Sequence, residues 1–227
     1  MSFMTADALD RAEAGSQDAA ALLRILTPTL KVRATRDARK VCGDALEMRG
    51  GIGYIEEFAT ARLLRDAHLG SIWEGTGNIV ALDALKRAVG RHGAESALSA
   101  DLHARLDDSA KVPQAWRNQL RGLSDRAVGF AREVAANTDN EADARRATSL
   151  LYHVASAVQL AWEAQRIDTM RGDARRLLLS RLVIDHRVLP SDPFRPAENR
   201  TQDAIAGLLL GDRAAGMAEV GELIAAA

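Results

Sequence analysis

The sequence predicts an all-α protein. Of its 227 residues, 47% are hydrophobic but only 4% are aromatic, and the prevalence of alanine and leucine favours helices over strands. Apolar residues recur every three or four positions along most of the chain, which is the spacing of one helix face. Glycines and prolines are concentrated in a few short stretches where turns are expected. Helices with such short connections are typical of antiparallel bundles.

The N-terminal part contains four expected helical segments. Residues 6–26 form the first, and Thr27-Pro28 then places a capping residue and a proline where a second helix could start or a long helix could kink. Residues 29–48 continue with helical spacing until Gly50, Gly51 and Gly53 end the pattern. A short basic helix over 60–68 and an apolar helix over 78–89 follow.

The stretch 90–93 contains two glycines and marks the expected domain boundary, with one domain over 1–90 and an appended helical domain over 94–227. Four amphipathic helices are expected in the second domain, over 95–107, 113–137, 141–171 and 173–188. A proline-containing loop over 190–196 precedes two short C-terminal helices.

Composition limits the classes of partner. The net charge of −1 comes from 30 basic and 31 acidic residues, so no overall field attracts nucleic acid or an anionic membrane. No stretch approaches the ~20 apolar residues of a membrane span, no signal peptide is visible, and the single cysteine, Cys42, fits a reducing compartment. A cytoplasmic protein is expected. No metal is expected, because no two of the five histidines have a ligand spacing with a third donor nearby.

The segment Ser71–Asn78 is the strongest candidate for chemistry. Glu74 lies in a turn between Trp73 and Gly75, just before an apolar helix. Glycines let a backbone approach a ligand closely, and a following helix start offers amide groups to an anion. The alternative interpretation is a surface turn in which Thr76 caps the next helix.

Four motifs occur in order around this segment: Ala45–Tyr54 with Gly-Gly-Ile-Gly-Tyr, Glu56-Glu57, Arg62–Ala67, and Ser71–Ile79. Together they resemble the last conserved block of the FAD-dependent acyl-CoA dehydrogenase family, from about Asp18 to about Val89. Leu26–Lys31 and the sequence Trp-Glu-Gly resemble the branch of that family associated with the response to DNA alkylation. The resemblance implies part of the family's C-terminal four-helix bundle, followed by an appended helical bundle.

The resemblance also implies roles for single residues. Glu74 would be the base that removes the α-proton of an acyl-CoA thioester, and Gly75 would lie beside that thioester. Flavin contacts would come from two sets of residues. Thr76, Gly77 and Asn78 would contact FAD at the head of their helix, whereas Glu47, Met48, Arg49, Gly50 and Gly51 would bind the FAD of a neighbouring subunit.

Two positions depart from the family pattern. Glu47 replaces the usual glutamine and would bring a carboxylate near a pyrophosphate, which is unfavourable unless a cation intervenes. Arg49 replaces an aliphatic residue and could be that cation. Taken alone, Gly50-Gly51 also fits an ordinary helix C-terminal stop.

The family's N-terminal helical domain and middle β-domain have no counterpart in this sequence. One hypothesis is therefore a catalytic fragment that dehydrogenates acyl-CoA with FAD after assembly with a complementary N-terminal chain, the isolated chain being inactive. The alternative is a non-catalytic helical interaction module that binds protein or DNA. Self-association is expected through apolar faces such as Leu22, Ile25 and Leu26, or Ile79, Leu82 and Leu85.

A DNA role would depend on a basic cluster in the second domain. The acidic residues Asp168, Asp173 and Asp185 are interleaved with it, which favours an ordinary solvated helix surface. The basic residues are Arg166, Arg171, Arg175, Arg176, Arg181 and Arg187.

Overall fold

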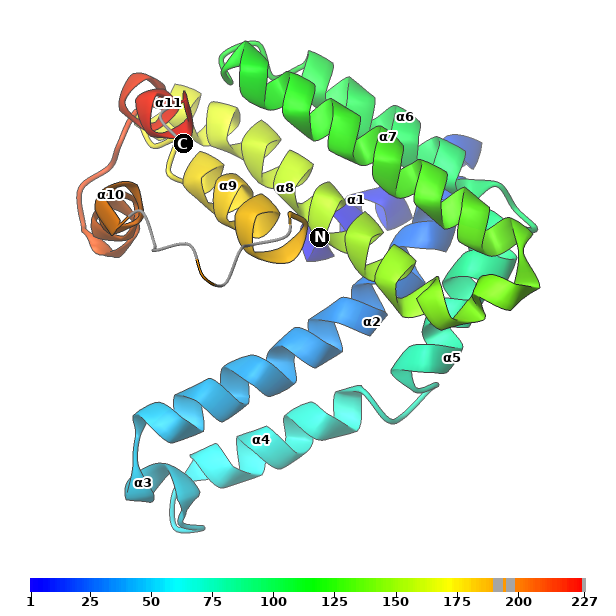
Figure 1. Cartoon of the computed structure of the whole chain (residues 1–227), viewed down its shortest axis with the longest axis horizontal. Coiled ribbons are helices and arrows are strands. Elements are labelled where there is room, and N and C mark those ends of the chain that lie inside the picture. Colours follow the sequence, from blue (N-terminus) through cyan, green and yellow to red (C-terminus); the bar gives the residue numbers. More distant parts are fainter. Residues whose placement is uncertain (190–193, 195–198, 226–227) are drawn as a thin grey trace. The chain divides into compact units, whose positions relative to one another are not determined.

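The computed structural model describes residues 1–189, 194 and 199–225, and within these residues the regular structure is entirely helical (Figure 1). The all-α prediction is confirmed. The chain divides into two compact units. The first unit comprises Ser2–Glu95 and Ala131–Tyr152, and the second comprises Met1, Ser96–Phe130 and His153–Ala227. The division into domains at 90–93 stays a prediction, and the grouping of 131–152 with the N-terminal segment was not foreseen.

The first helix ends earlier than predicted. Instead of one helix over 6–26, the structure has α1 (Ser2–Glu13) and α2 (Gln17–Met48). Gly15 has a φ of +98°, which favours glycine, and the Ser16 side chain accepts a hydrogen bond of 3.2 Å from the amide of Ala19. The prediction was wrong here because a glycine and a capping serine outweigh the surrounding helical spacing.

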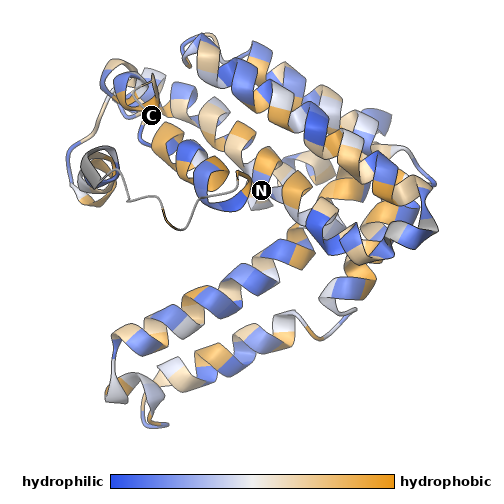
Figure 2. Ribbon diagram, viewed as in Figure 1, coloured by the Kyte–Doolittle hydropathy of each residue, from blue (hydrophilic) through white to orange (hydrophobic). Residues whose placement is uncertain are grey.

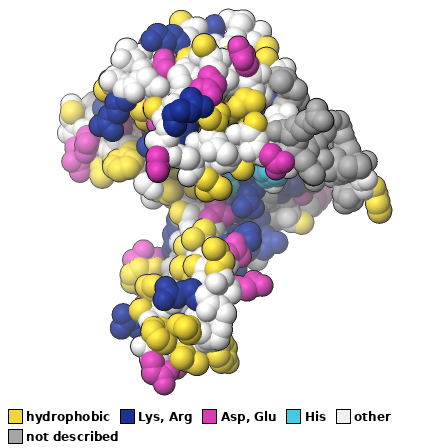
Figure 3. All heavy atoms as spheres, turned by 90° about the vertical axis from the view of Figure 1, so that its left-hand side faces the viewer, with side chains coloured by type: hydrophobic (Ala, Val, Ile, Leu, Met, Phe, Trp, Pro, Cys, Tyr) yellow, Lys and Arg dark blue, Asp and Glu magenta, His cyan; other side chains and the backbone are white. Residues whose placement is uncertain are grey.

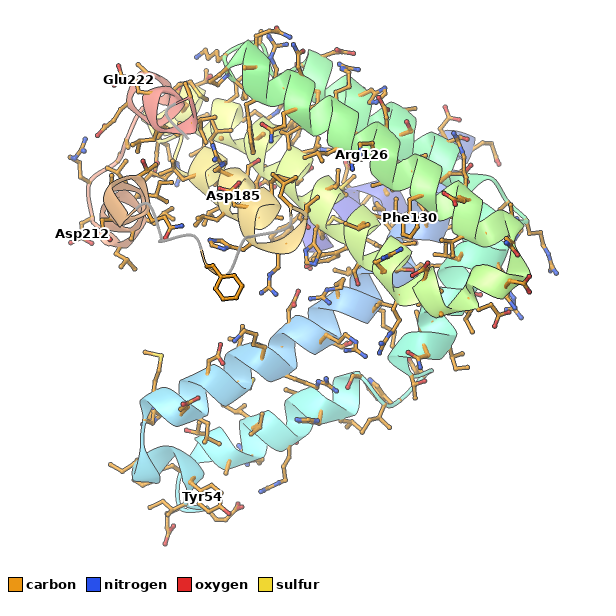
Figure 4. The ribbon with its side chains drawn as sticks, in the orientation of Figure 1. Tyr54, Arg126, Phe130, Asp185, Asp212 and Glu222 are labelled. Atoms are coloured by element: carbon orange, nitrogen blue, oxygen red, sulfur yellow. The ribbon has the colours of Figure 1, made fainter. Side chains whose placement is uncertain are left out.

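Helix α2 continues through Pro28 to Met48, so no second helix starts at Thr27. Its C-terminal half lies beside α4 (Ala59–Gly70), and the short α3 (Gly51–Tyr54) joins the two at one end (Figure 1). We call residues 33–70 the arm. The helices predicted over 29–48 and 60–68 are confirmed, and Tyr54 lies at the end of the arm, where it is 78% exposed (Figure 4).

The helix predicted over 78–89 is present as α5 (Gly77–Leu82), which continues into the π-helix η1 (Asp83–Val89). Single π-helical turns are rare and are frequently found at functional sites. The N-terminal half of α2 packs against α1, α5 and η1 and forms the core of the first unit. Because these helices cover one another, the faces expected to drive self-association are not free. Only Ile79 is exposed, Leu82 is half-buried, and the others are buried, namely Leu22, Ile25, Leu26 and Leu85.

The remaining helices follow the predicted order. They are α6 (Ala94–Asp107), α7 (Gln114–Ala136), α8 (Ala144–Arg171) after a 3₁₀ turn η2 (Thr138–Asp143), α9 (Arg176–Arg187), α10 (Asn199–Leu210) and α11 (Met217–Ala225). Hydrophobic and hydrophilic residues are mixed along these helices (Figure 2). The predicted proline loop over 190–196 lies outside the described residues except for Phe194.

The core of the second unit includes a buried polar link. Trp116 on α7 donates from Nε1 to the hydroxyl of Ser180 at 3.2 Å, and that hydroxyl donates to the carbonyl of Ala157 at 2.8 Å. One bonded chain therefore joins α7, α8 and α9, and each buried polar atom in it has a partner. Within the described residues, none of the helices combines the length and the apolar character that spanning a membrane demands.

Candidate active site

Glu74 has a left-handed backbone conformation with a φ of +51°, which no other non-glycine residue of the described chain adopts. Such a conformation costs a non-glycine residue about 1–2 kcal/mol. Gly75 continues the turn with a φ of +100°, and a methyl group on it would lie 3.1 Å from Cγ2 of Val80. Strain of this kind is concentrated at functional positions. The strained residue is therefore the one that the sequence singled out.

Lys31 on α2 anchors this turn, because its side chain binds main-chain atoms of the turn. Its Nζ donates hydrogen bonds to the carbonyl oxygens of Trp73, at 2.6 Å, and of Glu74, at 2.8 Å. Two turns further along α2, Arg39 donates to the hydroxyl of Ser71 at 3.2 Å. The Glu74 carboxylate itself makes no hydrogen bond to a described residue. The backbone is thus fixed while the carboxylate stays available.

A groove of about 770 Å³ lies beside Glu74, between α2 on one side and α5 with η1 on the other. Its apolar lining includes Leu23, Pro28 and Val80. Arg24 and Asp83 also line it, and Arg24 donates hydrogen bonds to the two carboxylate oxygens of Asp83 at 3.0 and 3.2 Å. We call this the Glu74 groove. The groove thus combines apolar residues with charged ones, the latter being Arg24, Lys31, Glu74, Asp83, Lys86 and Arg87. A concave surface that offers both can bury an apolar group and orient a polar one.

The first set of predicted cofactor residues lies in the same turn. Thr76 occupies the N-cap position of α5, but its side chain makes no capping hydrogen bond. Thr76 is thus the N-cap residue by position, as the alternative interpretation expects, and its carbonyl accepts a hydrogen bond of 3.0 Å from the amide of Val80. A methyl group on Gly77 would lie 3.5 Å from Nε of Arg36, so α2 approaches the turn closely there. Glu74, Gly75, Thr76, Gly77 and Asn78 thus form one continuous surface.

The second set, Glu47 to Gly51, lies at the other end of the arm (Figure 1). From Arg36 to Met48 the helix rises by roughly 20 Å at 1.5 Å per residue. One chain therefore does not bring the two sets together. Gly50 has a φ of +60°, which fits a helix end, and no ion pair joins the exposed side chains of Glu47 and Arg49.

The carboxylate of Glu74 is open to solvent in this chain. Trp73, its neighbour in the sequence, is itself 58% exposed. A carboxylate is a stronger base where water is excluded, because desolvation disfavours its charged form. The described residues fix the position of Glu74 and form one wall of the groove, but they do not cover the carboxylate.

Sequence reasoning assigned no role to Lys31, Arg24 or Asp83. Arg24 and Lys31 are seven residues apart and so share one face of α2, which was the available signal. Their partners are 59 and 42–43 residues away along the chain. A single sequence does not reveal contacts at that separation.

The basic cluster proposed for DNA is largely neutralised within the second unit. Arg166 pairs with Asp108, Arg175 with Asp173, Arg176 with Glu163 and Arg181 with Asp185. Arg166 also stacks on Trp162, at 3.6 Å from the ring centre. A phosphate-binding surface requires an excess of cations, so these pairs do not favour a role in binding DNA.

Replacing Lys31 with methionine tests the anchor of the turn. The substitution keeps the side-chain length but removes both hydrogen bonds to the turn, and we expect the free energy of unfolding to fall by about 1 kcal/mol. Lys40→Met on the same helix removes only an exposed pair with Asp44, which is worth at most about 0.5 kcal/mol. Urea unfolding and amide exchange at the turn measure both. Equal effects of the two variants would contradict the anchoring role.

Replacing Glu74 with glycine tests the backbone strain. Glycine accepts a positive φ, so we expect Glu74→Gly to raise the free energy of unfolding by up to about 1 kcal/mol. Glu74→Ala also removes the carboxylate but keeps a Cβ atom, so it should give no such gain. Thermal unfolding of the two variants measures the difference, and equal midpoints would indicate that the turn is not strained.

The N-terminal part of the chain is similar to a known protein family. Residues 1–90, less than half of the chain, match the family described as acyl-CoA dehydrogenase, C-terminal domain. Acyl-CoA dehydrogenase family member 11 of Caenorhabditis elegans is 42% identical over 86 residues, which cover 37% of this chain and 14% of that protein. AidB of Escherichia coli strain K12 is 43% identical over 63 residues, or 28% of this chain and 12% of AidB.

One solved structure is similar beyond the matched segment. The structure named Bd2924 apo-form aligns with a TM-score of 0.55 and 30% identity, covering 73% of this chain and 30% of that one. The likeness therefore extends past residue 90 into the helices that follow. The chain spans only 12–14% of the length of the two curated relatives above. Its N-terminal 90 residues are thus similar to one part of longer acyl-CoA dehydrogenases.

Proposed function

We propose that this chain is the C-terminal portion of an FAD-dependent acyl-CoA dehydrogenase, in which Glu74 removes the α-proton of an acyl-CoA thioester. The observation that carries the proposal is the left-handed Glu74, fixed through its backbone at the edge of a groove of about 770 Å³. A free carboxylate on a rigid turn can be aimed at one carbon atom of a bound substrate.

The Glu74 groove suits an acyl chain. Its apolar lining would bury methylene groups, and Gly75 leaves space for the thioester beside the base because it has no side chain. Charged residues also line the groove, including the Arg24–Asp83 pair. Acyl-chain length would be limited where the chain meets this pair, since a methylene group would remove water from the two charges without offering them a hydrogen bond.

The turn also suits a flavin. Thr76 keeps a free hydroxyl, Gly77 admits close approach, and Asn78 offers a further polar side chain. When bound, FAD would accept the β-hydrogen of the substrate as a hydride. Glu47, Met48, Arg49, Gly50 and Gly51 would serve the flavin of a second copy of the chain, because they lie too far along the arm to reach the same one.

The cover of the groove would come from outside the residues described here. The matched relatives are much longer than this chain, and either further residues of the same protein or a complementary N-terminal chain would exclude water from Glu74. We expect the chain alone to be inactive. Similarity to AidB, together with Leu26–Lys31, supports the branch associated with DNA alkylation.

The alternative function is a non-catalytic module that binds other proteins. The exposed apolar side chains of the arm favour it, since such patches are normally covered by a partner. They form part of the lower region in Figure 3 and include Val41, Met48, Ile52, Tyr54, Leu63 and Leu69. Flavin binding distinguishes the two functions, because the module would bind no FAD in any assembly.

Replacing Glu74 with glutamine tests the base. The variant keeps the shape and removes the proton acceptor, so turnover should fall by about 10²–10⁴-fold while flavin binding persists. Thr76→Val should instead weaken flavin binding. Turnover with an artificial electron acceptor is measured after the chain is combined with the missing domains. Full turnover by Glu74→Gln would exclude this residue as the base.

Self-association through the arm is a separate prediction. Sedimentation equilibrium at micromolar concentration should detect a dimer or larger assembly. Tyr54→Asp should weaken the assembly about tenfold or more, because it places a charge in an apolar interface. Phe3→Asp is the matched control, since Phe3 is 86% exposed but lies on α1. A folded monomer, or equal effects of the two variants, would contradict an interface at the arm.

A further inference from the structure

Most basic side chains of α2 have an identifiable partner. Arg24 pairs with Asp83, Arg33 with Asp37 and Lys40 with Asp44, while Lys31 donates to two backbone carbonyls. Arg36 and Arg39 differ. Neither forms an ion pair with a described carboxylate, although both are half-buried, and Arg39 donates instead to the neutral hydroxyl of Ser71.

These arginines lie on one face of α2. Arg33, Arg36 and Arg39 follow one another at intervals of three residues, which places them side by side along the helix. Arg145 at the start of α8 approaches the same group, close enough to act on the charge of Arg36. We call these four residues the arginine cluster. All of them belong to the first unit.

The arginine cluster carries positive charge that the described residues leave uncompensated. Among the described residues, the cluster has one carboxylate partner, Asp37, which pairs with Arg33 at 2.6 Å. The pKa of Arg36 is lowered from its ordinary value, first by burial and then by the charges of Arg145, Arg39 and Arg33. An arginine nevertheless remains charged at neutral pH. Like charges held together in this way destabilise the folded chain unless an anion binds among them.

Two buried atoms point to the same conclusion. The Nε atoms of Arg33 and Arg39 are buried and have no hydrogen-bond partner among the described residues. Buried polar groups are nearly always satisfied, so an unpaired pair of donors indicates a missing acceptor. An anion with several oxygen atoms would accept from more than one guanidinium at once.

We propose that the arginine cluster binds a phosphate or pyrophosphate group of a nucleotide-containing ligand. Arginine is well suited to this chemistry because its planar guanidinium donates two parallel hydrogen bonds to phosphate oxygens. Only the identity of the ligand rests on the proposed function, which offers two sources: the pyrophosphate of FAD and the phosphates of coenzyme A.

The position of the cluster supports a role at the Glu74 turn. Arg36 lies against Gly77, at 3.5 Å from a methyl group that would be placed there, and Arg39 contacts Ser71. A phosphate held by these two arginines would therefore sit beside the turn rather than at the end of the arm. The nucleotide part of the ligand would be anchored next to Thr76 and Gly77.

The test uses the full chain and inorganic pyrophosphate, with isothermal titration calorimetry as the readout. We expect the wild-type chain to bind pyrophosphate and Arg36→Gln to bind it about tenfold more weakly, since one charged contact is lost. Arg62→Gln is the matched control, because it removes one exposed positive charge from α4 of the same unit. No binding by the wild type, or equal losses in the two variants, would overturn the proposal.

The melting temperature without any anion provides a second measurement. The same substitution that weakens pyrophosphate binding should here stabilise the chain. Removing one charge from the cluster relieves repulsion, so Arg36→Gln should raise the melting temperature by about 1–3 °C. An arginine with only a structural role would lower it. Added pyrophosphate should stabilise the wild type more than Arg36→Gln. A lower melting temperature for Arg36→Gln, with an unchanged response to pyrophosphate, would also overturn the proposal.

Titrations with FAD and with coenzyme A then identify the source of the phosphate. A loss of affinity in Arg36→Gln for FAD alone assigns the cluster to the flavin, and a loss for coenzyme A alone assigns it to the substrate. The proposed function fails separately, through full turnover by Glu74→Gln or the absence of flavin from every assembly. Pyrophosphate binding that depends on Arg36 would stand in that case.

Discussion

The contact between Lys31 and the backbone of the Glu74 turn is the interaction on which the candidate site depends. Two carbonyl oxygens that are adjacent along a strained turn are held by one ammonium group from α2. The long helix therefore sets the position of Glu74, one wall of the groove and, through Arg36 and Arg39, the charged surface beside the turn. Local strain at Glu74 persists because this surrounding structure fixes it.

Periodicity and turn residues were sufficient to predict the helices, because each reflects local chemistry. The residues of the Glu74 turn were found because four short motifs, among them the glycine segment and Glu56-Glu57, occur in the same order as in the resembled family. The break at Gly15 and Ser16 was missed because helical spacing on both sides masked a single cap. Leu22 and Leu85 are buried, and Arg24 finds its partner, through contacts between segments that are distant along the chain. Such contacts cannot be read from a single sequence.

Position and environment are separable requirements for the proposed base, Glu74. The chain provides the first, since the backbone of Glu74 is fixed, but leaves the carboxylate and the neighbouring Trp73 in water. Proton abstraction from carbon needs both, because a solvated carboxylate is stabilised in its charged form and is a weak base. The strain at Glu74 is consequently more informative than its exposure: strain costs stability in every state, whereas exposure ends when a cover binds.

The arm separates two sets of residues that would act on the same kind of cofactor. Thr76 to Asn78 lie at its base and Glu47 to Gly51 at its end, about 20 Å apart along α2. A single copy cannot close both sets around one dinucleotide unless the arm folds back, and α4 beside α2 opposes that. Two copies satisfy both sets if the end of one arm reaches the base of the other. Covering the exposed apolar side chains of the arm and completing the cofactor site would then be one event, which links the stability of the assembly to its chemistry.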